Sequence, residues 1–146
     1  MTGWADFATE SPELAAAVRA RFEVRKHATM ATLRADGSPR ISGTEVAFAD
    51  GQLVLGSMPG ARKAIDLQRD PRVAVHSPTI DPPEDDPSDW GGEAKVAGRA
   101  VEAAPGEGGS HTFHVDLTEV VLTRVSGDQL VIESWHQGRG VQRVLR

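Results

Sequence analysis

The sequence predicts a mainly β fold, a small antiparallel β-barrel of six or seven strands with two or more helices packed at its rim. Short extended runs follow one another through most of the chain, and Asp-Gly and other Gly-rich turns join them. Only two stretches show a helical period. With 146 residues and no internal repeat, we expect a single domain over residues 1–146.

The first helix is predicted over residues 11–24, "SPELAAAVRARFEV". Ser11 suits the N-cap position, and Pro12 suits the first helical position, where its missing N–H removes no hydrogen bond. The apolar residues recur every fourth position and so share one face: Leu14, Val18 and Phe22. We expect this helix to pack on the barrel through that face.

After this helix the pattern becomes that of an extended meander. Strands are predicted over 28–34, 39–49 and 52–57. The turn "ADGS" (35–38) and the turn at Asp50-Gly51 separate them, and Asp-Gly between two extended runs is a strong hairpin signal. Closely spaced turns of this kind predict neighbouring antiparallel strands.

A second helix is predicted over 60–69, and a strand over 72–77. Asp70-Pro71 ends the helix, because the residue before a proline is pushed out of the α region. The next segment, 78–92, holds four prolines and two adjacent glycines, so it cannot form regular structure. Long loops in compact domains often act as lids, and we expect this one to be mobile and to lie at the mouth of the pocket.

The remaining chain returns to the sheet. Residues 93–104 alternate and predict a strand, 105–110 predict a turn, and 118–135 predict a hairpin around Gly127-Asp128. The tail after this hairpin, 136–146, is basic.

The charged residues are unevenly distributed along the chain. Of 21 acidic residues, six lie between positions 81 and 93 with no Lys or Arg among them, so the rest of the chain is nearly neutral. No basic stripe remains and aromatic residues are few, so we expect no nucleic-acid partner. No apolar run reaches the length of a membrane-spanning helix, and the first residues form no signal peptide, so we expect no membrane partner.

The absence of cysteine excludes disulfides and thiolate metal sites and fits a cytoplasmic protein. His111 and His114 are three positions apart in an extended run, so they lie on opposite faces. We therefore expect no metal site.

The stretch "SMPGARKA" (57–64) is the main candidate site. Arg62 and Lys63 follow Pro59-Gly60, where the second helix is predicted to begin. A helix N-terminus exposes unpaired N–H groups and a partial positive charge, and two cations would add to its affinity for an anion. The alternative is a solvated basic pair, in a position that the helix dipole slightly disfavours. The residues alone leave both interpretations open.

Three segments in order, "ATMATLRADGSPRIS", "GSMPGARKAIDLQRDPRVAVHS" and "SWHQGRGVQR", resemble the pyridoxamine 5′-phosphate oxidase-like family of FMN-binding split β-barrels. One branch of that superfamily uses a deazaflavin (coenzyme F-420) instead of FMN. The likeness extends from about Ala28 to Arg146, and Ser-x-x-Gly-x-Arg-Lys followed by a helix and Asp-Pro-Arg is its most specific part. It implies a split barrel and a homodimer whose cofactor lies at the subunit interface.

The resemblance also implies which residues hold the cofactor. Ser57, Arg62 and Lys63 match positions that hold the flavin phosphate, and Trp135 and Arg143 match tail positions near the partner subunit's cofactor. No catalytic residue is assigned. The full set of expected cofactor-binding residues is Ser42, Ser57, Met58, Arg62, Lys63, Trp135, Arg139 and Arg143.

Three departures from the family pattern bear on the reaction. Ser42 stands where vitamin-oxidising members have a phosphate-binding Arg, and Ala61 stands where they have a Ser. Their tail pattern Arg-x-His-x-Arg becomes Arg139-Gly-Val141-Gln-Arg143, without the His that contacts pyridoxal. Oxidation of pyridoxamine phosphate is therefore not expected.

The sequence leaves three functions open. The leading prediction is an FMN- or deazaflavin-dependent oxidoreductase that transfers a hydride to or from a small-molecule substrate, with the protein supplying position, electrostatics and water exclusion. The alternatives are a non-catalytic homodimer that binds a cofactor or another flat ligand, and a barrel that has lost its cofactor.

Overall fold

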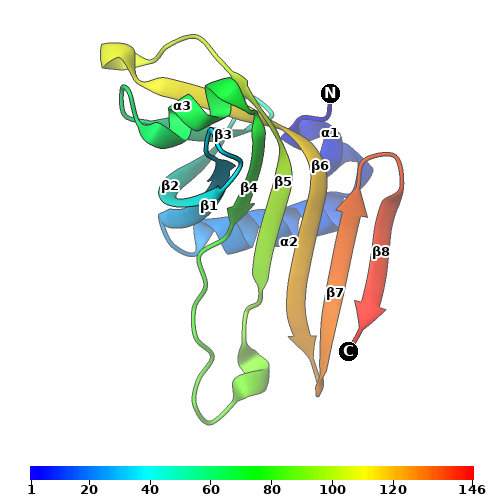
Figure 1. Cartoon of the computed structure of the whole chain (residues 1–146). Coiled ribbons are helices and arrows are strands. Elements are labelled where there is room, and N and C mark those ends of the chain that lie inside the picture. Colours follow the sequence, from blue (N-terminus) through cyan, green and yellow to red (C-terminus); the bar gives the residue numbers. More distant parts are fainter.

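A computed structural model describes residues 1–146 of the protein. It contains three α-helices, eight strands and two single-turn 3₁₀ segments (Figure 1). The elements are α1 (Trp4–Glu10), α2 (Pro12–Glu23), β1 (His27–Leu33), β2 (Pro39–Ala49), β3 (Gln52–Ser57), α3 (Arg62–Arg69), β4 (Arg72–His76), η1 (Pro87–Asp89), β5 (Glu93–Glu102), η2 (Glu107–Gly109), β6 (His111–Ser126), β7 (Gln129–His136) and β8 (Gly140–Leu145).

Six strands close into an antiparallel barrel. All eight strands form one sheet in the order β3-β2-β1-β4-β5-β6-β7-β8, and β3 also pairs with β6. The 16-residue length of β6 permits this closure, because residues 111–114 pair with β3 while residues 119–126 pair with β7. β7 and β8 extend the sheet beyond the barrel (Figure 1). The predicted mainly β fold, a small antiparallel split barrel with peripheral helices, is confirmed.

The predicted meander is confirmed in detail. β2 and β3 have the predicted bounds, 39–49 and 52–57. Between them Asp50 and Gly51 both have positive φ, 52° and 75°. Two successive residues with positive φ are what a two-residue type I′ hairpin requires, and Asp-Gly adopts them readily. The dipeptide therefore fixes both the turn and the register of the two strands.

The barrel interior and the inner faces of α1 and α2 form a continuous apolar core. The face predicted for the first helix is buried in α2, as expected. Aromatic rings join the helices to the sheet: Trp4 packs edge-on against Phe7 and Phe48, and Phe7 packs edge-on against Trp135. Such pairs stabilise a core beyond the area they bury.

Three features differ from the sequence predictions. α1 was not predicted, since its seven residues give little period to detect, although Trp4 and Phe7 anchor it in the core. β6 begins at His111 instead of residue 118, because its first residues pair with β3 to close the barrel. β8 forms where only a basic tail was expected, so the sheet has one strand more than the upper predicted count.

The acidic loop between β4 and β5 does not lie at the mouth of the candidate site, so that expectation is wrong. β4 begins beside α3 and runs away from it, so residues 78–92 emerge at the opposite end of the barrel (Figure 1). None of them lines either of the two cavities next to α3. Composition marks this segment as a loop but says nothing about the direction of the strand before it. Its higher mobility stays a prediction.

Neither a membrane-spanning helix nor a metal cluster is found. None of the helices is both long and apolar enough to cross a bilayer. No group of three or more His, Cys, Asp or Glu side chains is arranged to hold a metal ion.

Candidate functional site

The chain bends from a strand into a helix at the rim of the barrel. β3 ends at Ser57, and Gly60 then turns the chain with φ of 70°, a conformation that residues with a side chain rarely adopt. For this reason α3 begins at Arg62 and not at Gly60. Its N-cap residue, Ala61, has no side-chain oxygen to bond the first N–H groups, so α3 has no side-chain cap.

A cavity of about 600 Å³ opens on the outer face of β2 and β3, and we term it the β2–β3 trough. Alternate residues of β2 face outward because the side-chain period of a strand is two. The volume lies within the range of small-molecule sites. The lining comprises His27, Gly43, Thr44, Glu45, Ala47, Val54, Gly56, Ser57, Met58, Pro59, Lys63, Ser110 and Thr112.

The floor of the trough is low because two of its residues have no side chain. A Cβ added at Gly43 or Gly56 would meet no atom within 4 Å, and neither residue has positive φ. Neither packing nor backbone conformation therefore requires glycine at these positions. A glycine inside a strand is destabilising, and it often marks a place where a ligand approaches the backbone closely.

Two polar groups with unused hydrogen-bonding capacity lie at the α3 end of the trough. The Lys63 Nζ donates one hydrogen bond, at 2.8 Å, to the carbonyl oxygen of Gly43, and an ammonium has three donors. Burial lowers the pKa of Lys63 because it removes water from the ammonium. The Ser57 Oγ is buried without a hydrogen-bond partner, which is a costly state for a polar atom. An anionic group bound here would accept hydrogen bonds from Lys63, and from the Ser57 Oγ once that side chain rotates toward the trough.

One hydrogen bond fixes the turn that borders this end of the trough. The Gly60 N–H donates to the His111 Nε2 at 3.1 Å.

At the far edge of the trough the His27 Nε2 lies 3.6 Å from the Glu45 Oε1, and both side chains are mainly exposed. The trough is thus lined by one partly buried cation, Lys63, and one exposed ionisable pair.

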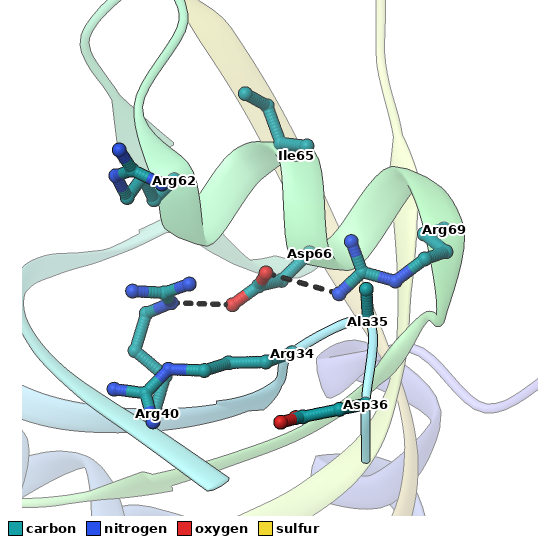
Figure 2. A pocket seen from close by; sticks show the side chains of 8 residues that line it. All are labelled: Arg34, Ala35, Asp36, Arg40, Arg62, Ile65, Asp66 and Arg69. Carbon is teal, nitrogen blue, oxygen red and sulfur yellow. Dashed lines mark hydrogen bonds and ion pairs between the residues drawn. The ribbon is translucent and has the colours of Figure 1, made fainter. Parts of the chain in front are cut away.

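A second cavity of about 400 Å³ lies between α3 and the β1–β2 turn (Figure 2). We term it the arginine pocket. Arg62, at the start of α3, lines this pocket and not the trough. The other lining residues are Arg34, Ala35, Asp36, Arg40, Ile65, Asp66 and Arg69.

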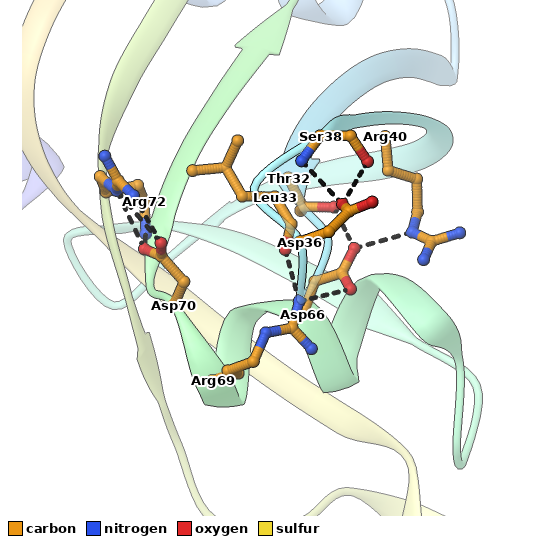
Figure 3. A network of polar contacts seen from close by, with 9 residues as sticks. All are labelled: Thr32, Leu33, Asp36, Ser38, Arg40, Asp66, Arg69, Asp70 and Arg72. Atoms are coloured by element: carbon orange, nitrogen blue, oxygen red, sulfur yellow. Dashed lines mark hydrogen bonds and ion pairs between the residues drawn. The ribbon is translucent and has the colours of Figure 1, made fainter.

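The buried carboxylate of Asp66 organises the arginine pocket (Figure 3). It accepts hydrogen bonds from the Thr32 Oγ1 at 2.7 Å, the Arg40 Nε at 2.7 Å and an Arg69 Nη at 3.1 Å. Burial alone would raise the pKa of Asp66, but the hydrogen bonds from Arg40, Thr32 and Arg69 outweigh it and lower that pKa. Asp66 therefore stays ionised and ties α3 to β1 and β2.

The expected phosphate-binding residues do not all converge. Ser57, Met58 and Lys63 line the trough together, and the Met58 side chain is 78% exposed. Arg62 faces the arginine pocket instead, because successive residues of a helix point roughly 100° apart. In this structure the two neighbouring cations, Arg62 and Lys63, thus face different cavities.

The other expected residues lie away from the trough. Ser42 is half-buried on the inner side of β2 and lines neither cavity. Trp135 is a core residue, 1% exposed, and its indole N–H donates to the Glu10 Oε1 at 3.1 Å. Arg139 and Arg143 are exposed in the β7–β8 hairpin, at the opposite edge of the sheet from β3 (Figure 1). A role of Arg139 and Arg143 near a partner's cofactor stays a prediction, whereas the burial of Trp135 in its own subunit's core argues against contact between its ring and a cofactor.

Several site residues were not predicted from the sequence. Gly43, Glu45 and Gly56 were overlooked, although the period of β2 places residues 43 and 45 on one face. The contact between Thr32 and Asp66 joins residues 34 positions apart and leaves no local signal in the sequence.

Comparison with known proteins adds a family match. The family described as pyridoxamine 5′-phosphate oxidase matches residues 14–123, a span that contains the trough and the arginine pocket. Among curated proteins there is no match.

Solved structures of low sequence identity share the fold. PhzG from Burkholderia lata, solved with tetrahydrophenazine-1-carboxylic acid, is 13% identical with a TM-score of 0.67, covering 98% of this chain and 92% of that one. A pyridoxamine 5′-phosphate oxidase-related, FMN-binding protein from Nostoc punctiforme is 10% identical with a TM-score of 0.65, covering 93% and 95%. An F420 reductase is 20% identical with a TM-score of 0.51, covering 68% and 92%. At these identities the likeness is one of fold.

Proposed function

The chain belongs to the pyridoxamine 5′-phosphate oxidase family, and from that premise we propose that it is a flavin-type oxidoreductase. It binds FMN or the deazaflavin coenzyme F-420 in the β2–β3 trough and transfers a hydride to or from a small organic substrate. The observation that carries this proposal is the trough itself: a floor open at Gly43 and Gly56, with Lys63 and the unpartnered Ser57 Oγ at one end.

The residues of the trough fit such a coenzyme. Lys63 and Ser57 would bind its phosphate, since both have free hydrogen-bonding capacity and Lys63 is a partly desolvated cation. Gly43 and Gly56 leave room for a planar ring against the sheet, and Val54 offers it apolar contact. With Ser42 in place of an Arg, the phosphate would be held by fewer cations than in the vitamin-oxidising members of the family.

The reaction divides between coenzyme and protein. The ring of a bound flavin or deazaflavin supplies the hydride chemistry. The protein must hold the ring against β2 and β3 and keep water from its exposed side. The trough of one subunit would hold the ring, but it is open and would not exclude water.

A second copy of the chain would cover the trough. Ile41 lies on the outward face of β2 and is 76% exposed, and Met58 at the end of the trough is 78% exposed. Large apolar side chains left in water around a site are typical of an interaction surface. We therefore include a homodimer in the proposal, and sedimentation that shows a stable monomer at micromolar concentration would contradict it.

The test is a titration of the purified protein with FMN and with coenzyme F-420, followed by absorbance and fluorescence. We expect one of them to bind saturably and to undergo single-turnover oxidation by a small organic acceptor after chemical reduction. Lys63→Ala should weaken coenzyme binding about 10- to 100-fold, because that is the loss of affinity expected when one charge-assisted hydrogen bond is removed. The exposed Lys95 on β5 provides the control, Lys95→Ala, which should bind like the wild type. If neither coenzyme binds, the proposal fails.

The second candidate is a dimer that binds the coenzyme without catalysis. One observation favours it: apart from Lys63, the ionisable groups of the trough are His27 and Glu45, whose side chains are 74% and 58% exposed. No shielded acid or base is available to assist a proton transfer. Saturable binding without turnover would identify this second function.

A further inference from the structure

A histidine of β6 holds the turn between β3 and α3. Residues 58–61 form this turn, since the Ala61 N–H donates to the carbonyl oxygen of Met58 at 3.1 Å. Proline in the second position and a glycine with φ of 70° in the third are typical of a type II turn. The N–H of that glycine, Gly60, donates outside the turn, to the His111 Nε2 at 3.1 Å. The turn is therefore tied to an acceptor that lies 51 positions away along the chain.

This hydrogen bond defines the protonation state of His111. A backbone N–H can only donate, so the Nε2 must present its lone pair, and the proton of a neutral ring then lies on Nδ1. The Nδ1 faces the Glu102 Oε1 at 3.4 Å, and the Gln68 Nε2 donates to both oxygens of Glu102 at 3.1 Å. Only 18% of the His111 side chain is exposed. The two partners of the ring thus require opposite roles of its two nitrogens.

A second proton on His111 would break the contact with Gly60. Both ring nitrogens of an imidazolium are donors, so the Nε2–H would point at the Gly60 N–H. On the other side of the ring the carboxylate of Glu102 stabilises the charged form, so protonation exchanges one hydrogen bond for an ion pair. Histidine is the side chain whose charge normally changes between about pH 5 and 8. The two states of the ring therefore favour two states of the turn.

The other groups in contact with the ring are uncharged. The Gln68 Nε2 lies 3.5 Å from Nδ1, and the Phe113 ring is stacked on the imidazole with 6.5 Å between the ring centres. Lys63, on the same helix as Gln68, directs its ammonium to the backbone of β2 instead. Glu102 is the only carboxylate within 4 Å of the ring nitrogens.

We propose that His111 is a pH-sensitive positioning residue: its neutral ring holds the turn 58–61 in the conformation of this structure, and a second proton releases that turn. The turn carries Met58 at the end of the trough and leads into α3, on which Lys63 lies. Its release changes the end of the trough at which, under the proposed function, the coenzyme is held. The effect on the coenzyme rests on that proposed function, whereas the effect on the turn does not.

The first experiment measures how well the Gly60 N–H is protected from solvent exchange, by NMR on the ligand-free, full-length protein from about pH 8 to about pH 5. After correction for the intrinsic effect of pH on exchange, the protection should fall about 3- to 10-fold, the factor expected for one neutral hydrogen bond. It should fall with the same midpoint as the titration of the His111 ring. At the upper pH the ring should carry its proton on Nδ1.

Three variants separate the switch from a structural role. His111→Gln keeps an acceptor for Gly60 but cannot gain a charge, so the protection should persist and no longer depend on pH. His111→Ala removes the acceptor, so the protection should be low at every pH, and a thermal melt checks that the variant is folded. His114→Gln is the control, because His114 is also on β6 but lines neither cavity, and it should behave like the wild type.

Three results would overturn the proposal. They are a Gly60 protection that does not follow the His111 ring, one that still falls with pH in His111→Gln, and one that is unchanged in His111→Ala.

The coenzyme titration separates this proposal from the proposed function. Between about pH 8 and about pH 5.5, the affinity of the wild type for FMN or coenzyme F-420 should fall about 3- to 10-fold more than that of His111→Gln. The comparison cancels the effects of pH on the coenzyme phosphate and on Lys63, which both proteins share. Equal pH dependence in the two proteins would overturn the positioning role. If the wild type binds neither coenzyme, only the oxidoreductase proposal fails, and the protection of the Gly60 N–H decides the role of His111 by itself.

Discussion

Filling the floor of the β2–β3 trough should weaken coenzyme binding without harming the fold. A Cβ at Gly56 would meet no atom within 4 Å, and φ at this residue is not positive. Gly56→Val therefore places a branched side chain in open space above the sheet. A branched residue also suits a strand better than glycine, so we expect the free energy of unfolding to stay equal or rise by roughly 0.5–1 kcal/mol.

The same side chain would occupy the place of the planar ring. Overfilling a packed contact costs roughly 1–3 kcal/mol, so the affinity for FMN or coenzyme F-420 should fall at least about tenfold. Isothermal titration measures the affinity, and urea denaturation measures the stability. Ala49→Val is the matched control, since Ala49 is exposed on the same face of β2 but does not line the trough. Unchanged affinity in Gly56→Val would show that the ring lies elsewhere, and a large loss of stability would show that Gly56 is structural.

Three further changes test the rest of the structure. Asp66→Asn removes the buried charge that pairs with two partly exposed arginines, and it should lower the free energy of unfolding by about 1–3 kcal/mol at neutral pH. The pKa of Asp66 is lower in the folded state than in the unfolded state, so the stability that its ionised carboxylate contributes is complete above the unfolded pKa of 3.8 and is lost as the pH falls below it. The difference in free energy of unfolding between wild type and variant, measured by urea denaturation, should therefore narrow at acidic pH. A difference that stays constant with pH would contradict this. Trp135→Phe removes a buried N–H donor and core volume, so the stability should fall by about 1–3 kcal/mol. Coenzyme affinity should stay within twofold, and a larger loss would place Trp135 at the ligand. Deleting residues 83–88 should change the Tm by less than about 2 °C and leave coenzyme affinity unchanged, because this loop lies away from the trough; a large fall in Tm would show that it is structural.

Local chemistry made most of the barrel predictable. Asp50-Gly51 identifies a hairpin by itself because few dipeptides accept two positive φ values, and the bounds of β2 and β3 follow from it. The apolar face of α2 was predictable in the same way, because its periodic residues all lie within one short stretch of sequence. The features that differed from the sequence predictions depend on partners distant in sequence. The start of β6 forms a strand because it pairs with β3, and α1 is held in place because Trp4 and Phe7 pack in the core.

The candidate site was predictable only in part. The motif around Ser57 and Lys63 lies at the rim of the barrel, where both residues line the β2–β3 trough. Sequence adjacency also grouped Arg62 with Lys63, but a helix separates neighbouring side chains, and Arg62 belongs to a cluster assembled from β1, β2 and α3. The partners that fix this cluster, Thr32 and Arg40 on Asp66, are distant in sequence and meet only in the closed barrel.

A crystal structure of the protein with the coenzyme that binds more tightly tests the central claim most directly. The proposal predicts the ring over Gly43 and Gly56 on the outer face of β2 and β3, with a phosphate oxygen about 2.7–2.9 Å from the Lys63 Nζ. It also predicts a second copy of the chain over the exposed side of the ring. Coenzyme bound in the arginine pocket, or anywhere else with the trough empty, would contradict the assignment.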